Sequence, residues 1–225
     1  MIEELSPDFL RTRLSSKWSS FGADVLPSNP AEMDFGVAPG IQRRMQELVD
    51  KQQYGYAPRG AANPVALVVD GFVRRMRDRF GFAADPARVV VLNDLVQAVM
   101  STVMAFAEPH EGVALQVPAY PAFLSLLAQS GRPIVLNPMR EQAGRYAIDV
   151  EGLEAALAPD TRVLLLCHPH NPTGRAFTRE ELAPLAALAI ERDMVVVCDE
   201  IHADLMLDGR RHMPFGAMFP EAADR

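Results

Sequence analysis

Two polar side chains stand where two apolar segments of the chain end. Asn171 lies in the sequence His-Pro-His-Asn-Pro-Thr-Gly, which follows the apolar run Val163–Cys167, and Asp199 directly follows the run Met194–Cys198. Each run predicts a buried strand, and a helix between them would make the two strands parallel. Because the carboxyl ends of parallel strands meet at one edge of a sheet, we expect Asn171 and Asp199 to share that edge.

These two residue types could hold a small aromatic ligand. A buried Asp199 carboxylate needs a partner, and a protonated ring nitrogen of a bound heterocycle would serve. The alternative for Asp199 is a helix N-cap or a salt bridge to a nearby arginine. For Asn171 the alternative is an Asx-type turn, in which the amide bonds only its own backbone. A proline-fixed Asn loop next to an Asp after the neighbouring strand favours the ligand site.

The composition is that of an ordinary globular protein. Of 225 residues, 49% are hydrophobic and 23% are charged. The net charge is −7 and no basic cluster stands out, so we expect neither nucleic acid nor a membrane as a partner. No apolar run is long enough to cross a bilayer, and the first residues lack a signal-peptide core. Cys167 and Cys198 are predicted to be buried, reduced thiols of a cytoplasmic protein.

The pattern of apolar residues predicts an α/β fold. Residues 1–40, rich in Pro, Ser and Asn, are expected to form an N-terminal arm with loops. From residue 41 the strands are short continuous apolar runs, which indicates a mostly parallel sheet in a three-layer sandwich. The expected helices are Ile41–Gln53, Pro64–Phe80, Leu95–Ala107, Ala122–Gln129, Val150–Ala158 and one opened by a Thr178–Glu181 capping box; the expected strands are Arg88–Leu92, Val113–Val117, Pro133–Leu136, Val163–Cys167 and Met194–Cys198.

Five short motifs carry a resemblance to a known family. They are MDF at 33–35, YGY at 54–56, PAYPAF at 118–123, HPHNPTGRAF at 168–177 and DEIHADL at 199–205. Together and in this order they resemble the pyridoxal-phosphate (PLP) enzymes of the aspartate aminotransferase superfamily, fold type I. Within the class I/II aminotransferases they look most like the cystathionine β-lyase (C–S lyase) branch. The resemblance implies a PLP-binding large domain at residues 41–225, with a PLP-dependent transferase-like fold.

The resemblance also implies a role for each matching residue around the cofactor ring. Asn171 would donate to the phenolic oxygen of PLP, and Asp199 would pair with the pyridinium nitrogen. Tyr120 would stack on the ring face, and His202 would support the orientation of Asp199. Simple structural roles, in the core for Tyr120 and as a satisfied histidine for His202, are the alternatives.

The cofactor phosphate would be held at a helix start. The backbone amides of Leu95 and Val96 are the candidates, since a helix N-terminus can bind phosphate without glycine. The family has small Gly/Ser-like residues just before this point, whereas this chain has Asp94, which would bring negative charge unless it caps the helix. Tyr56 would reach the phosphate of a neighbouring subunit, so we expect a homodimer; a loop anchor is its alternative.

Met33, Asp34 and Phe35 would line the entrance for an amino-acid substrate.

The chain departs from the family in one major respect, because the chemistry needs a lysine amine that forms a Schiff base with PLP. Only Lys17 and Lys51 are present, both upstream and in the wrong contexts. We therefore expect no catalytic residue in this chain, and a domain that is incomplete at the C-terminus, before the Schiff-base lysine and a small C-terminal domain.

The leading hypothesis for function is a PLP-dependent C–S β-lyase, which releases a thiol, pyruvate and ammonia from cystathionine or a similar cysteine conjugate. A PLP-dependent aminotransferase and a catalytically inactive cofactor-binding relic are the alternatives. A metal hydrolase site made of His168, His170, Asp199 and His202 is a further alternative. The prolines beside the two histidines already explain that segment as a turn, so no metal is expected.

Overall fold

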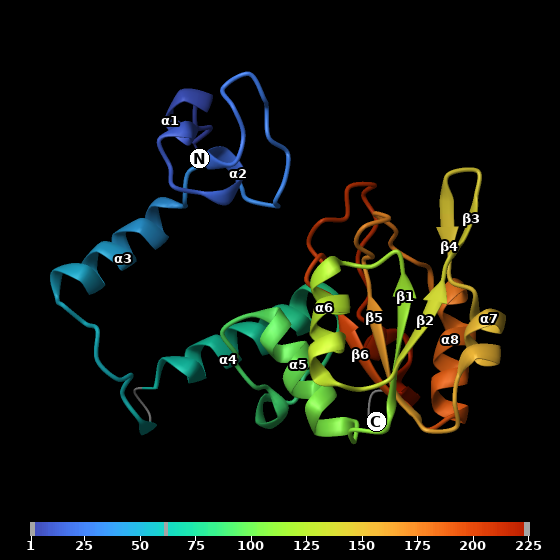
Figure 1. The fold of residues 1–225 in the computed structure, drawn as a ribbon. Helices are drawn as coiled ribbons and strands as arrows, with labels where there is room; N and C mark the ends of the chain where they lie inside the picture. The colour runs from blue at the N-terminus through green and yellow to red at the C-terminus, as the bar shows by residue number, and fades with distance from the viewer. Residues whose placement is uncertain (1–2, 61–62, 223–225) are drawn as a thin grey trace. The chain divides into compact units, whose positions relative to one another are not determined.

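The computed structural model describes residues 3–60 and 63–222. The chain forms two compact units, Met1–Arg59 and Gly60–Arg225. The first unit contains α1 (Pro7–Arg11), α2 (Ser16–Ser19) and α3 (Pro39–Asp50) (Figure 1). Serine side chains cap α1 and α2, as expected for short helices in a polar segment. No described helix is both long and apolar enough to cross a membrane.

The second unit is built on a four-stranded parallel sheet. Its strands are β1 (Gly112–Val117), β2 (Ile134–Pro138), β5 (Thr161–Cys167) and β6 (Val195–Asp199), in the order β2-β1-β5-β6. Every pair in this sheet is parallel. The strands are therefore joined by crossovers, and their carboxyl ends all lie at the same edge. The prediction of a mostly parallel sheet is confirmed.

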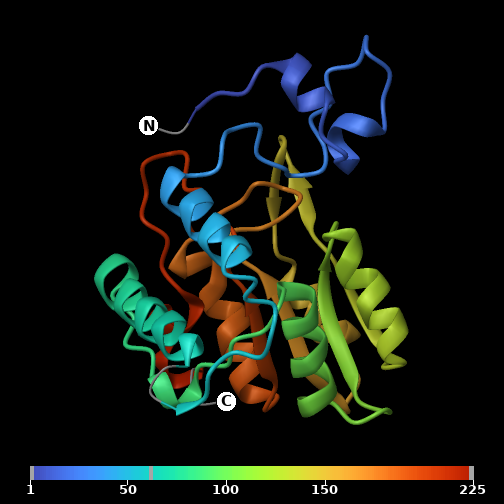
Figure 2. The same cartoon turned by 90° about the vertical axis from the view of Figure 1, so that its left-hand side faces the viewer.

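Helices cover both faces of this sheet. Helices α5 (Leu95–Phe106) and α6 (Pro121–Ser130) pack on one face, and α7 (Val150–Ala156) and α8 (Arg179–Glu191) pack on the other (Figure 1). Figure 2 views the unit from the side of α5 and α6. Two separate apolar clusters result, one in each helix–sheet interface. The predicted three-layer sandwich is confirmed, and its core explains why the strands are continuous apolar runs.

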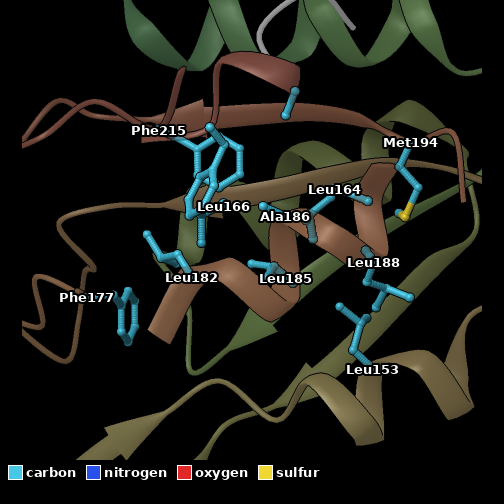
Figure 3. Packing of buried hydrophobic residues seen from close by; sticks show 14 of the residues in the cluster. Leu153, Leu164, Leu166, Phe177, Leu182, Leu185, Ala186, Leu188, Met194 and Phe215 are labelled. Atoms are coloured by element: carbon cyan, nitrogen blue, oxygen red, sulfur yellow. The ribbon is translucent and has the colours of Figure 1, made fainter. Parts of the chain in front are cut away.

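The larger of the two clusters fixes α8 against the sheet. Leu182 and Leu185 of α8 have no exposed side-chain surface, and they pack with Leu164 and Leu166 of β5 (Figure 3). Burying one leucine contributes about 1.5–3 kcal/mol. The helix begins at the predicted capping box, in which Thr178 and the first turn of α8 satisfy each other's backbone amides. The start of α8 is therefore held both by packing and by its cap.

One predicted strand is wrong. The segment Arg88–Leu92 was expected to be a strand, but Pro86–Arg88 is a short 3-10 helix and no strand follows it. In the described part of the chain no strand pairs with this segment, and the Val90 side chain is 77% exposed. Strand preference depends on packing against neighbours, so three consecutive valines do not form a strand without a partner.

Other elements differ from the prediction in detail. A two-stranded antiparallel sheet, β3 (Arg140–Gln142) and β4 (Arg145–Ala147), was not predicted. Its turn uses Ala143 and Gly144, both with positive φ, and alanine is a weak signal for such a turn. The remaining elements are α4 (Pro64–Arg75), which continues as the π-helical turn η2 (Met76–Phe80), then α9 (Phe215–Met218) and the 3-10 helix η4 (Pro220–Ala222).

The packing of α8 generates a stability prediction. Leu185→Ala should lower the free energy of unfolding by about 2–5 kcal/mol, because it leaves a cavity between α8 and β5. Leu207→Ala is the matched control, since the Leu207 side chain is 95% exposed, and it should change stability by less than about 0.5 kcal/mol. Urea unfolding followed by circular dichroism measures both. Equal effects of the two substitutions would contradict this packing.

Candidate functional site

Three polar or aromatic side chains follow three neighbouring strands at the carboxyl edge of the sheet. Tyr120 comes after β1, Asn171 after β5, and Asp199 is the last residue of β6. Because β1, β5 and β6 are adjacent and parallel, the three residues lie along one edge, as predicted for Asn171 and Asp199. Figure 1 shows the loops after β5 and β6 rising from this same end of the sheet.

Asp199 is a buried carboxylate without a cationic partner. Its side chain is 5% exposed, one oxygen accepts a hydrogen bond from the Ile201 amide at 3.0 Å, and the other lies 3.7 Å from the Cys167 thiol. No salt bridge reaches it within the described residues. Burial raises the pKa of the Asp199 carboxyl above its ordinary value, and the Ile201 amide and the nearby His202 oppose that rise. The contact with the Ile201 amide belongs to a turn, and no helix begins at Asp199, so neither alternative, a helix N-cap or an arginine partner, is seen among the described residues.

The strand pairing brings Cys167 to this carboxylate. Cys167 of β5 is in register with Asp199 of β6, and the His168 amide donates to the Asp199 carbonyl at 2.8 Å. The predicted buried, unpaired thiol is confirmed for Cys167, and burial raises its pKa to about 12. Its contact with Asp199 could not be predicted from residue spacing, since strand register is set by long-range packing.

The Asn171 side chain is half-buried and is not used by the fold. Within the described residues no hydrogen bond involves its amide group, so the Asx-turn alternative is not observed. The loop is closed instead by its neighbours, because the His170 amide donates to the Arg175 carbonyl at 2.7 Å and the Gly174 amide donates to the His170 carbonyl at 2.9 Å. The amide of Asn171 therefore remains available for a ligand.

Tyr120 stands at the start of α6. Its ring is 41% exposed and meets the ring of Phe123 edge to face, with centroids 5.5 Å apart. Phe123 is buried in the cluster beneath α6, so this contact anchors a tyrosine ring that remains partly exposed. This arrangement fits the expected stacking surface better than a core position.

The amino end of α5 lies at the same edge of the sheet. Helix α5 leads into β1 through residues 107–111 and packs on the sheet, so it runs opposite to the strand. Asp94 caps the helix, because its side chain accepts a hydrogen bond from the Gln97 amide at 2.7 Å. In the described structure the amides of Leu95 and Val96 donate to no other group. Asp94 therefore acts as the cap that the sequence allowed for, and it keeps a negative charge at this helix end.

Four of the predicted site residues lie in the first unit. Met33 and Phe35 are 69% and 48% exposed, and the Tyr56 side chain is fully exposed. Asp34 has internal partners, since its two oxygens accept from Lys17 Nζ and from Trp18 Nε1, each at 2.7 Å. The hydrogen bond from Lys17, together with that from Trp18, holds the pKa of the Asp34 carboxyl below its ordinary value.

The two histidines of the Asn171 loop are packed into the second unit. His168 stacks on Phe177, and His170 Nδ1 lies 2.8 Å from the Thr173 hydroxyl. Burial lowers the pKa of both histidines to about 4, so both are neutral near pH 7. Among the described residues no group of three or more His, Cys, Asp or Glu side chains is arranged to hold a metal ion. These contacts favour a structural role for both rings.

The environment of Asp199 predicts how the ligand-free protein responds to pH. Asp199→Asn keeps an oxygen for the Ile201 amide and removes a buried charge, so it should raise the free energy of unfolding at pH 7 by roughly 1–3 kcal/mol. Because the folded-state pKa is raised, the carboxyl stabilises the fold while protonated and loses this contribution as the pH rises. The gain should shrink toward about pH 4. Urea titrations across this range measure it, and a gain independent of pH would contradict the assignment.

Known proteins share both the sequence and the fold. Residues 69–220 match the family model described as aminotransferase class I and II. Cystathionine beta-lyase PatB of Bacillus subtilis is 37% identical over 216 residues, which are 93% of this chain and 54% of that protein. The chain spans about half the length of the curated relatives it matches.

Solved structures agree with the sequence relatives. Cystalysin from Treponema denticola, which contains pyridoxal 5'-phosphate, matches with a TM-score of 0.86 at 26% identity, over 100% of this chain and 58% of that one. N-succinyldiaminopimelate aminotransferase from Mycobacterium tuberculosis matches with a TM-score of 0.71 at 29% identity, over 80% of this chain and 46% of that one. The resemblance carried by the five motifs is confirmed, and the chain belongs to the class I and II aminotransferase family.

Proposed function

We propose that residues 1–225 form the cofactor-binding part of a PLP-dependent C–S β-lyase. The single observation that carries the proposal is Asp199, a buried carboxylate that has no cationic partner among residues 3–60 and 63–222, at the same sheet edge as the Asn171 amide, which these residues also leave unbonded. Relatives named cystathionine beta-lyase support the lyase reaction over other PLP chemistry. The substrate class would be cystathionine or a similar cysteine conjugate.

The donor set of the edge fits PLP. The Asp199 carboxylate would accept from a protonated pyridine nitrogen, and this pairing would offset the cost of burying the charge. The Asn171 amide would donate to the phenolic oxygen, and Tyr120 would cover one ring face. The amides of Leu95 and Val96, which have no acceptor in the described part of the chain, would receive the phosphate, although the Asp94 cap makes this end of the site less favourable for an anion.

The chemistry follows from keeping the ring nitrogen protonated. When bound, PLP withdraws electrons from the substrate α-carbon, so that the α-proton can leave and the β-carbon–sulfur bond can break. In this reaction cystathionine and water give homocysteine, pyruvate and ammonia. Asp199 would maintain the positive ring nitrogen, and Asn171 would fix the ring in its plane. His202, half-buried beside Asp199, would help to orient the carboxylate.

The covalent attachment of PLP is not assigned to either lysine of the chain. Lys17 is 6% exposed and donates to the Glu32 carbonyl and to Asp34 within the first unit. Lys51 is the C-cap residue of α3. We assign residues 1–225 to binding and orienting the cofactor, while Met33, Asp34 and Phe35 stay predicted residues of the substrate entrance.

We also propose a homodimer in the cytoplasm. The exposed Tyr56 ring has no ring contact within the described residues, which suits a side chain that reaches the cofactor phosphate of a neighbouring subunit. The unpaired Cys167 and Cys198 suit a reducing compartment.

An aminotransferase of amino acids is the second candidate function. The structural match to N-succinyldiaminopimelate aminotransferase favours it, since both reactions share the cofactor and the first proton abstraction. The test supplies the full product of the gene with PLP. Pyruvate released from cystathionine without a keto acid supports the lyase, and amino-group transfer that depends on a keto acid supports the aminotransferase. PLP binding without either reaction would favour a cofactor-binding relic.

The proposed ring contact predicts a loss of cofactor affinity. Asp199→Asn should weaken PLP binding roughly 10- to 100-fold, because a charge-assisted hydrogen bond contributes about 1.5–3 kcal/mol. Asp160→Asn is the control, since Asp160 is exposed in the turn that precedes β5, at the opposite edge of the sheet. Titration of the cofactor-free protein by PLP absorbance measures both affinities. Unchanged binding by the Asp199 variant would refute the proposed ring contact.

A further inference from the structure

The loop that carries Asn171 is closed on itself by short contacts. His170 and Arg175 form an isolated antiparallel bridge, and the His170 ring lies 2.8 Å from the Thr173 hydroxyl. Gly174 has a φ of +67°, which permits the return of the chain. These contacts define the shape of the loop. They do not attach it to the helices or to the hairpin beside it.

Arg175 provides that attachment through its side chain. Its guanidinium donates two hydrogen bonds to the Glu181 carboxylate, at 2.5 and 2.7 Å, and a third to the Tyr146 carbonyl at 2.8 Å. The guanidinium also lies over the Phe177 ring at 5.0 Å, and the side chain is only 11% exposed. Nη2 serves the Glu181 carboxylate and Nη1 serves the Tyr146 carbonyl, so two nitrogens of one planar guanidinium are held at once and the orientation of the side chain is fixed.

Glu181 is itself held rigidly at the start of α8. One of its oxygens accepts from the Thr178 amide at 2.8 Å, and its own amide donates to the Thr178 hydroxyl. Although burial opposes ionisation, the hydrogen bonds from Arg175 and Thr178 hold the pKa of the Glu181 carboxyl below its ordinary value. The carboxylate that receives Arg175 is therefore ionised near pH 7 and anchored to the helix that packs on the sheet.

We propose that Arg175 and Glu181 are positioning residues that aim the Asn171 amide at the phenolic oxygen of the cofactor. This inference rests on the proposed function. The bridge between His170 and Arg175 makes the loop rigid. Arg175 lies four residues beyond Asn171, and its pair with Glu181 joins the loop to α8. Loosening the pair lets the loop rotate, so the cofactor loses the contact with the phenolic oxygen and keeps its contact with Asp199.

The neighbouring Arg145 offers a matched control. Its guanidinium donates to one of the two Glu181 oxygens at 3.4 Å. Its side chain is 67% exposed, and it belongs to β4 rather than to the Asn171 loop. An exposed ion pair of this kind contributes little to stability. A substitution at Arg145 therefore alters a contact of Glu181 without releasing the loop.

The experiment compares two cofactor probes on the full product of the gene. One probe is PLP, and the other is 3-deoxypyridoxal 5'-phosphate, which lacks the phenolic oxygen. Arg175→Lys keeps the charge and loses the planar group whose two nitrogens reach Glu181 and Tyr146 together, and Glu181→Gln keeps the size and loses the charge. Each should weaken binding of PLP roughly tenfold and leave binding of the 3-deoxy probe within about twofold. Asn171→Ala should behave in the same way, and Arg145→Lys should alter neither affinity.

The outcomes separate the two proposals. One outcome is that Asn171→Ala weakens binding of PLP alone while the Arg175 and Glu181 variants weaken binding of both probes equally. That result overturns the positioning role and leaves the contact between Asn171 and the cofactor standing. If Asn171→Ala does not discriminate either, the proposed contact between Asn171 and the cofactor falls, and the positioning role falls with it. Thermal unfolding shows whether each variant is folded. If the Arg175 variant does not fold, the Glu181 variant decides the question, and the reverse also holds.

Discussion

A carboxylate buried at the end of a strand, with no positive charge against it, is the constraint on which the candidate site depends. Asp199 receives one backbone amide and lies near one weak thiol donor, which leaves much of its desolvation cost uncompensated within the described residues. The apolar layers above and below β5 and β6 stabilise the fold enough to tolerate it. A bound cation at this point would recover that cost, so binding and charge are linked in one residue.

The parallel sheet determines which residues can join Asp199. Strand β5 lies between β1 and β6, so the loops after these three strands meet at one edge. Each loop supplies a different kind of contact: an aromatic face from Tyr120, an amide from Asn171 and a carboxylate from Asp199. The amino end of α5 reaches the same edge because α5 runs opposite to β1. A flat, charged heterocycle with an oxygen and a phosphate matches this combination of groups.

The sequence was informative wherever a local signal decided the structure. The strands β5 and β6, the capping box at Thr178 and the shared edge of Asn171 and Asp199 follow from apolar runs and from chain order, and the structure confirms them. The strand expected at Arg88–Leu92 failed because a strand needs a neighbour that sequence patterns do not identify. The contact between Cys167 and Asp199 depends on strand register, and the ion pair of Arg175 with Glu181 depends on side-chain geometry. Neither could be predicted from residue spacing.

The capping box of α8 has a consequence beyond the helix. The Glu181 carboxylate accepts hydrogen bonds from the Thr178 amide and from Arg175 at the same time, so one side chain stabilises both the first turn of α8 and the Asn171 loop. Fraying of that turn would release the Asn171 loop, and ordering of the loop by a bound molecule would in turn protect the turn from opening. Under the proposed function, hydrogen exchange at the first amides of α8 would therefore be thermodynamically coupled to occupancy of the cofactor site, although the proposed cofactor contacts lie outside α8.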